Sequence, residues 1–327
     1  MCGAIWERAL ARERKLSFAR QDALTHSTRL AVPRLNAVGC APESANEQTS
    51  DRRSRSNPQY RLRRMLTRGD FRKRFGGNAV IGMVHVAALP GAPLYGGSMR
   101  AIVDAALRDA RALRDGGCDA IAFENFGDRP FFKGRVPAET VAALTRVIVE
   151  VVAEVGMTFG VNVLRNDAAS AIAIAAATGA AFSRVNVHTG AMLADQGIIE
   201  GEAADTLRLR DALRADVAIF ADHLVKHAVP LAPVDPIQVA KDLRVRGLAD
   251  ALIITGSETG ATADAAMLER LREAIDAPLI VGSGLTAENA ASFFAADAAI
   301  VGTSLKSEGR VDLGRVSAVV NSFASRN

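Results

Sequence analysis

The chain has few cysteines, few aromatic residues and no long apolar run. Its three cysteines among 327 residues, Cys2, Cys40 and Cys118, form no CxxC pair. An odd number without close spacing argues against a disulfide framework and a zinc knuckle, and indicates a reduced, cytoplasmic protein. No apolar run reaches the roughly 18 residues that a membrane span needs. We therefore expect no transmembrane segment.

Positive charge is concentrated in the first quarter of the chain. Residues 1–75 contain 17 Lys and Arg against 7 Asp and Glu, whereas the remainder contains 23 against 29. Residues 1 to about 57 show no sustained period of 2 or 3.6, apart from a short candidate helix at 5–16, and 36–58 is rich in Ser, Asn, Pro and Arg. This composition predicts a disordered basic extension over residues 1–64.

The extension has several interpretations. It is a solvated tail, or Met65 is the true start of the protein. A nucleic-acid arm or an organellar transit segment would also be rich in Arg and poor in acidic residues. No aromatic residues interleave the arginines as a single-strand stacking surface would need, so we predict no nucleic-acid partner.

From Val80 onward, short apolar runs alternate with segments of helical periodicity. The runs are continuous and β-branched, as in strands that are buried on both faces. Eight β/α units in about 245 residues predict a (β/α)₈ TIM barrel of the α/β class over residues 78–325. A doubly wound open sheet is the rival, but no GxGxxG follows an early strand. The predicted strands are 80–86, 119–124, 158–164, 182–187, 217–222, 251–255, 279–281 and 298–301. The predicted helices are 99–113, 137–155, with Pro137 as its first residue, 167–178, 204–214, 236–246, 263–275, one beginning near Thr286, and 313–323.

Two glycine-rich turns follow the last two predicted strands. Gly-rich loops at the carboxyl ends of neighbouring parallel strands expose backbone N–H groups on which a phosphate dianion can sit. A helix beginning at Thr286 would add its positive end. The alternative is that small residues merely terminate these strands. The predicted phosphate-binding residues are Gly256, Gly282, Ser283, Gly284, Gly302, Thr303, Ser304 and Lys306.

Polar residues gather at the carboxyl ends of the other strands, where barrel enzymes place their active sites. Glu124 and Asp222 would be the acid/base or metal-binding carboxylates. Lys226, if it points inward, would have a lowered pKa and act as a base or form a Schiff base. Some have a plainer interpretation: His85 as a satisfied core histidine, and Lys226 as a solvent-facing loop residue. The predicted catalytic residues are His85, Glu124, Asn162, Asn186, His188, Asp222, Lys226 and His227.

Two further expectations concern the fourth strand and the segment after it. Because residues two apart on a strand face the same side, we expect Asn186 and His188 to share a face. The segment around Asp195, Gln196 and Gly197 is expected to be a long loop, which either closes as a lid or stays solvated.

Several stretches resemble the BtpA/SgcQ family over residues 78–325. They are IGMVHVAALPGAPLYGG at 81–97, FENFGDRPF at 123–131, VNVLRND at 161–167, RVNVHTGAMLADQGIIEG at 184–201, ADHLVKHA at 221–228, and the glycine-rich turns near the end. The resemblance implies a phosphate-binding barrel. It also implies no firm reaction, since one branch of the family is linked to photosystem I biogenesis and another to sugar-phosphate genes.

Three functions remain in competition. The first is an enzyme that acts on a small phosphorylated metabolite, as a lyase, isomerase or hydrolase of a sugar or nucleoside phosphate. The second is a metal-dependent hydrolase in which Glu124, Asp222 and two histidines bind a divalent metal. The third is a non-catalytic assembly factor. The cofactor stays open, and a homo-oligomer is compatible with the sequence.

Overall fold

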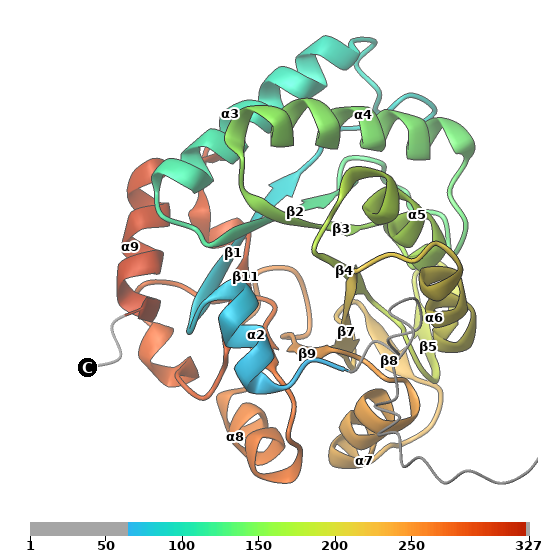
Figure 1. Ribbon diagram of the computed structural model, residues 1–327, viewed down its shortest axis with the longest axis vertical. Helices are drawn as coiled ribbons and strands as arrows, with labels where there is room; N and C mark the ends of the chain where they lie inside the picture. The colour runs from blue at the N-terminus through green and yellow to red at the C-terminus, as the bar shows by residue number, and fades with distance from the viewer. Residues whose placement is uncertain (1–64, 325–327) are drawn as a thin grey trace, which may run out of the picture. The chain divides into compact units, whose positions relative to one another are not determined.

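The computed structural model describes residues 65–324, in which eight parallel strands close into a barrel (Figure 1). Neighbouring strands around the ring follow the order β1-β11-β10-β9-β7-β4-β3-β2. The predicted (β/α)₈ fold is confirmed, whereas the expected tail and the candidate helix at 5–16 lie outside the described residues. The strands are β1 (Ala79–His85), β2 (Ala120–Glu124), β3 (Thr158–Asn162), β4 (Phe182–Val185), β7 (Ala218–His223), β9 (Ala251–Ile254), β10 (Leu279–Val281) and β11 (Ala298–Val301).

Helices follow most strands and surround the barrel (Figure 1). Ser98 caps α3 by accepting a hydrogen bond from the Ala101 amide, as short polar side chains do at helix starts. Pro137 is the cap of α4 rather than its first residue, one position from the prediction. The helices are α3 (Met99–Asp115), α4 (Ala138–Val155), α5 (Ala168–Thr178), α6 (Ala203–Ala212), α7 (Pro236–Lys241), which continues as a π-helix (Asp242–Arg246), α8 (Ala265–Ala274) and α9 (Leu313–Ala324).

Strand alternation divides the apolar core into two layers. On β1, Ile81 and Met83 belong to the inner cluster, whereas Val80 and Val84 pack with the helices outside. This is the period of two that a pleated strand imposes. The strands are buried on both faces, which explains why they read as continuous apolar runs in the sequence.

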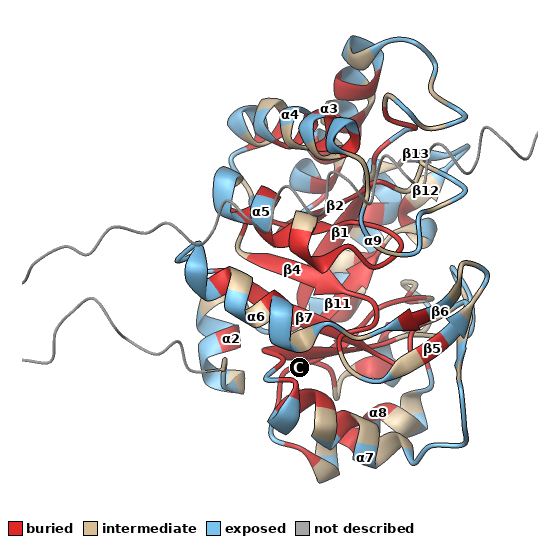
Figure 2. Cartoon of the chain, turned by 90° about the vertical axis from the view of Figure 1, so that its right-hand side faces the viewer, coloured by how far each residue is buried: buried red, intermediate tan, exposed pale blue. Residues whose placement is uncertain are grey.

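A helix that the sequence analysis missed, α2 (Arg68–Phe75), closes the amino-terminal end of the barrel, which we call the floor. Its Phe71 and Phe75 pack with Phe182 and Phe220 from the barrel strands, at ring-centroid distances of 5.5–5.8 Å. Gly160 on β3 makes room for this cluster, because a Cβ there would come within 2.2 Å of the Phe182 ring. Figure 2 shows α2 on one side of the barrel and the β5–β6 hairpin on the opposite side.

Polar contacts fix the segment around α2 to the strand starts. The Leu66 amide donates to Asp250 just before β9 (3.0 Å), and Arg68 pairs with the buried Asp297 just before β11 (3.1 Å). Thr67 and Asp70 form a capping box at the start of the helix. The described fold therefore begins near Met65, ahead of the predicted barrel boundary at residue 78.

Two predictions about the upper side of the barrel were wrong. The segment after β4 is a hairpin rather than a loop, and it forms a three-stranded sheet of β5 (Ala191–Ala194), β6 (Gly197–Glu200) and β8 (Ala228–Pro230). No α-helix begins at Thr286, and only a short 3₁₀-helix (Ala290–Phe293) follows. The reason is local: the Asn289 side chain accepts from the Thr286 amide and donates to the Gly284 carbonyl, which fixes a tight turn.

Candidate functional site

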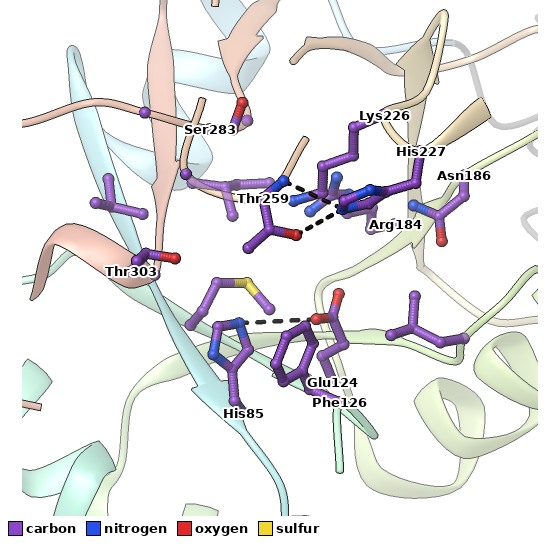
Figure 3. A pocket seen from close by; sticks show the side chains of 18 of the residues that line it. His85, Glu124, Phe126, Arg184, Asn186, Lys226, His227, Thr259, Ser283 and Thr303 are labelled. Carbon is purple, nitrogen blue, oxygen red and sulfur yellow. Dashed lines mark hydrogen bonds and ion pairs between the residues drawn. The ribbon is translucent and has the colours of Figure 1, made fainter. Parts of the chain in front are cut away.

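A cavity of about 830 Å³ opens at the carboxyl ends of the strands, which we call the mouth. Figure 3 shows side chains from several strands and their loops converging on it. Eleven of the predicted site residues line the cavity. They are His85, Glu124, Asn186, Lys226, His227, Gly282, Ser283, Gly284, Gly302, Thr303 and Ser304.

Four other predicted residues lie just behind the lining and contact it. Asn162 donates to Glu124, Asp222 accepts from Asn186, and Lys306 donates to His85. The Gly256 amide donates to the Ser283 hydroxyl, so that this amide has a partner already. These residues orient the lining groups.

His188 does not belong to the cavity. Its Nε2 lies 2.8 Å from the carbonyl oxygen of Gly247, and its ring is buried away from the mouth. Burial lowers the pKa of His188. β4 ends at Val185, so the alternation that was expected to place Asn186 and His188 on one face does not reach His188.

One side of the mouth holds a chain of polar contacts through His85 (Figure 3). The Lys306 ammonium lies 2.8 Å from Nδ1 of His85, and Nε2 of His85 lies 3.7 Å from Glu124 Oε2. The Asn162 side chain donates to the other Glu124 oxygen at 2.7 Å. Because an ammonium only donates, Nδ1 accepts and the ring carries its proton on Nε2, facing Glu124.

The protonation state of His85 follows from its surroundings. Burial lowers the pKa of His85 to about 4; Glu124 opposes this shift, and Lys306 adds to it. The Phe126 ring also stacks on the imidazole, with centroids 4.5 Å apart. His85 is therefore a neutral hydrogen-bond donor near pH 7, and its donor nitrogen faces a carboxylate in the cavity.

Arg184 and Asp222 form a buried ion pair beside this chain. Both guanidinium contacts measure 2.9 Å, and Asn186 donates to the same carboxylate at 2.9 Å. The pair is bidentate, which is the strong geometry for arginine and carboxylate. With its oxygens engaged in this way, Asp222 is a poor partner for Glu124 in a metal site. Within residues 65–324, no three His, Cys, Asp or Glu side chains gather as a ligand set.

Lys226 and His227 follow β7 at the rim of the cavity. Burial lowers the pKa of Lys226 to about 8, and the nearby Arg184 contributes in the same direction. Nε2 of His227 accepts from the Thr259 amide at 3.1 Å and lies 2.9 Å from the Thr259 hydroxyl. Arg165 donates to the Lys226 carbonyl at 2.5 Å and so fixes the backbone there.

The part of the mouth formed by the turns after β10 and β11, next to His85 on β1, is made of backbone. The Gly282 amide donates to the Ile254 carbonyl at 2.7 Å, so it is not a free donor. Among residues 65–324, the amides of Ser283, Gly284, Thr303 and Ser304 have no hydrogen-bond acceptor. We call these four residues the amide cup. Gly284 has a φ of +68°, and a Cβ there would lie 2.3 Å from the Thr262 Cα, so only glycine fits.

Several lining residues were missed by the sequence analysis. Arg184 lies inside a short strand that otherwise reads as a buried run, and only its pairing with Asp222 identifies its role. Arg129 stacks over the Phe126 ring at 5.2 Å and belongs to a loop of ordinary composition. A sequence signal was available for Arg184. It lies two residues before Asn186 in the predicted strand 182–187, and residues two apart on a strand share a face.

The fold and this mouth define a class: a (β/α)₈ barrel whose mouth combines charged side chains with glycine-rich loops. A model of the BtpA family matches residues 77–325, and the chain belongs to that family. Within the described range of 65–324, no helix has the length and apolar character for crossing a membrane.

Named relatives agree with this assignment. The chain is 44% identical to the photosystem I biogenesis protein BtpA of Synechocystis, over 76% of this chain and 88% of that protein. It is 34% identical to the putative sgc region protein SgcQ of Escherichia coli, over 73% and 91%. Among solved structures it is similar to (S)-3-O-geranylgeranylglyceryl phosphate synthase of Thermoplasma acidophilum. The TM-score is 0.51 at 15% identity, over 79% of this chain and 98% of that one.

Proposed function

We propose that the protein is an enzyme acting on a small phosphorylated metabolite, whose phosphate group binds the amide cup. The observation that supports this most is that four amides without an acceptor in the described part of the chain lie in one cavity with Glu124, His85 and Lys226. Unpaired backbone donors are costly in a folded protein unless water or a ligand meets them. Two adjacent turns of such donors suit a dianion.

The charged side of the mouth would carry the chemistry. A phosphate held at the cup leaves the rest of the metabolite facing Glu124, which Asn162 orients at 2.7 Å. Glu124 would move a proton as general acid or base. The neutral His85 would donate from Nε2 to a developing negative charge, since its Nδ1 is already occupied by Lys306.

The structural neighbour from Thermoplasma is described in complex with its substrate sn-glycerol-1-phosphate. At 15% identity this likeness concerns the fold alone. Support for a phosphate site in this chain comes instead from the amide cup and from the charged side chains of the same cavity.

The test is calorimetric titration of the full chain with inorganic phosphate and with a panel of sugar phosphates. Thr303→Asp places a carboxylate beside the cup at an exposed side chain of the cavity, and Thr303→Asn is its uncharged match. The introduced carboxylate and a phosphate bound at the cup carry like charges and repel each other. Thr303→Asp should therefore weaken phosphate binding by about tenfold or more. Thr303→Asn should bind as the parent does.

Circular dichroism checks that both variants keep the fold. Equal phosphate binding by the two folded variants would contradict the proposal that phosphate binds at the amide cup. So would a parent that binds none of the phosphorylated compounds. In either case the glycine-rich turns would only terminate strands.

A non-catalytic role in assembly is the second candidate. It is supported by the name of the Synechocystis relative and by an apolar row on the hairpin sheet. Leu193 is paired with both Ile198 and Val229 across three strands, and all three side chains are 45–58% exposed. Turnover of a phosphorylated compound with the purified protein alone would favour the enzyme.

A further inference from the structure

We propose that Lys226 forms a Schiff base with the carbonyl carbon of a phosphorylated aldehyde or ketone. This inference rests on the proposed function, since the phosphate of that compound would occupy the amide cup. It narrows the substrate class from phosphorylated metabolites to phosphorylated carbonyl compounds.

The position of Lys226 suits a nucleophile. The residue lines the cavity together with the amide cup and Glu124, and its side chain is half-buried (Figure 3). Throughout residues 65–324, the Lys226 ammonium enters no hydrogen bond and no ion pair; only its backbone carbonyl has a partner, Arg165. An amine that is free of partners is available to a substrate.

Lys306 provides a contrast within the same site. Its nitrogen is also partly buried, but it lies 2.8 Å from Nδ1 of His85 and donates to it. That contact occupies the amine and orients the imidazole. Of the two lysines at the mouth, only Lys226 is therefore both reachable and uncommitted.

The cations around Lys226 favour its neutral form. Arg184 lies at the same mouth, and Arg165 holds the Lys226 backbone. Burial first, and then Arg184, lower the pKa of Lys226 to about 8, against the opposing effect of the carboxylates of Glu124 and Asp222. Roughly a tenth of such an amine is neutral at pH 7, against less than a thousandth at the ordinary lysine pKa. Lysines activated in this way are the ones that form Schiff bases.

The step balances without an oxidant or reductant. The Lys226 nitrogen adds to the carbonyl carbon, forming a C–N bond while the C=O π electrons move to oxygen. A proton passes from nitrogen to the oxygen, and Glu124 is the group placed to carry it. The carbinolamine hydroxyl then takes up the proton that the Lys226 ammonium released before the attack and leaves as water, while the nitrogen lone pair forms a protonated C=N bond. The sum is one ammonium and one carbonyl converted into one iminium and one water.

The iminium is an electron sink, so the bond to the neighbouring carbon becomes easier to break. The reaction class that follows is proton abstraction or carbon–carbon cleavage next to the former carbonyl. Among the three classes proposed from the sequence, this favours a lyase or an isomerase over a hydrolase.

The experiment traps the iminium by reduction. The full-length protein is incubated with glyceraldehyde 3-phosphate or dihydroxyacetone phosphate and sodium cyanoborohydride, and intact mass and peptide mapping follow. The chain has only Lys15, Lys73, Lys133, Lys226, Lys241 and Lys306, so mapping is unambiguous. We expect one adduct per chain, on Lys226. Excess inorganic phosphate should slow its formation, and unphosphorylated glyceraldehyde should label more slowly.

Three variants complete the test. Lys226→Met and Lys226→Arg should lose the adduct, and Lys133→Met, at an exposed loop position, should keep it. Calorimetry with inorganic phosphate on Lys226→Met shows whether the cup is still intact. Labelling that maps to other lysines, or that excess phosphate does not slow, would overturn the proposal.

Failure of this inference is distinguishable from failure of the proposed function. If the parent binds inorganic phosphate but forms no adduct with either carbonyl compound, the proposed Schiff base is wrong. The proposal of a phosphate site at the amide cup is then retained. If the parent neither binds phosphate nor forms an adduct, both proposals fall.

Discussion

The two ends of the barrel differ in what fills their centres. The centre of the floor is apolar: Phe71 and Phe75 of α2 pack on Phe182 and Phe220, and each of these side chains is at most 5% exposed, while a buried charge of this end, Asp297, is paired with arginines at the start of β11. The mouth contains Glu124, Arg184 and Asp222, each at most 7% exposed, together with the titratable Lys226. Charges are expensive to bury, whereas phenylalanine side chains gain free energy on burial.

From this difference we expect the floor to contribute mainly to the stability of the fold and the mouth mainly to ligand binding and turnover. A change at the floor should cost folding free energy and leave ligand binding intact. A change at the mouth should reduce binding or turnover, and some changes there should make the protein more stable, as is common at active sites.

The largest effect is expected from Glu124→Gln at the mouth. The amide oxygen can still accept from Asn162, so the shape and one hydrogen bond are kept while the charge is removed. If Glu124 moves a proton in the reaction, turnover should fall by about 10²–10⁴-fold. The measurement is the rate with a phosphorylated compound found by calorimetry. A variant with full turnover would show that Glu124 has only a packing role. It would also contradict the expectation that changes at the mouth reduce turnover.

The sequence predicted the fold better than the site, for a physical reason. Strands buried on both faces leave continuous apolar runs, and helices between them leave a 3.6-residue period, so local pattern was enough for the barrel. Glu124 and Asn186 were found because they end such runs. Arg184 was missed because its partner Asp222 lies on another strand, and no local pattern reports a pairing across 38 residues.

The floor helix and the hairpin were missed for related reasons. Within α2 only Phe71 and Phe75 are buried, and the basic residues around them match the composition of the preceding tail. The hairpin at Ala191–Glu200 turns through Asp195 and Gln196, which read equally well as a solvated loop. Both elements are fixed by distant contacts, which override weak local preference.

The next largest effect is expected from Phe71→Ala at the floor. The ring is fully buried and packs on Phe75 and Phe220 at 4.9 and 5.7 Å, so truncation leaves a cavity. The free energy of unfolding should fall by about 3–5 kcal/mol. Denaturant unfolding measures this loss, and Val149→Ala on an exposed face of α4 should change stability by less than about 0.5 kcal/mol. Phosphate binding by the folded variant should equal that of the parent; a weakened affinity would show that the floor and the mouth are coupled.

A gain in stability is expected from Lys226→Met. In the folded protein the pKa of Lys226 is lowered to about 8, so below pH 8 the charged amine opposes folding. Removing it should raise the free energy of unfolding at pH 7 by up to about 3 kcal/mol. Between pH 8 and the ordinary lysine pKa the unfolded chain binds the extra proton, so the parent gains stability as the pH rises.

The difference between Lys226→Met and the parent should therefore shrink across that interval and be constant below pH 8. Denaturant unfolding at a series of pH values measures this difference in the free energy of unfolding, with Lys133→Met as the exposed control. A difference that does not change with pH would mean that Lys226 is not desolvated in the folded protein. The mouth would then lack the buried amine without an ion-pair partner that distinguishes it from the floor, where Asp297 is paired.

The smallest effect is expected from removing residues 1–64. Apart from the candidate helix at 5–16, their sequence has no sustained helical or strand period. Among the described residues, the contacts that hold the floor begin at Leu66, whose amide donates to Asp250 and whose carbonyl accepts from Arg244 at 2.8 Å. A shortened chain beginning at Met65 keeps both contacts, together with Arg68 and the phenylalanine cluster. It should unfold cooperatively and with the same midpoint as the full chain. A chain beginning at Gly77 lacks α2 and should lose several kcal/mol, because two buried phenylalanines leave the core. Thermal unfolding of the three proteins side by side makes the comparison. If the chain from Met65 melts without cooperativity, the first 64 residues contribute to the fold, and the floor extends further than α2.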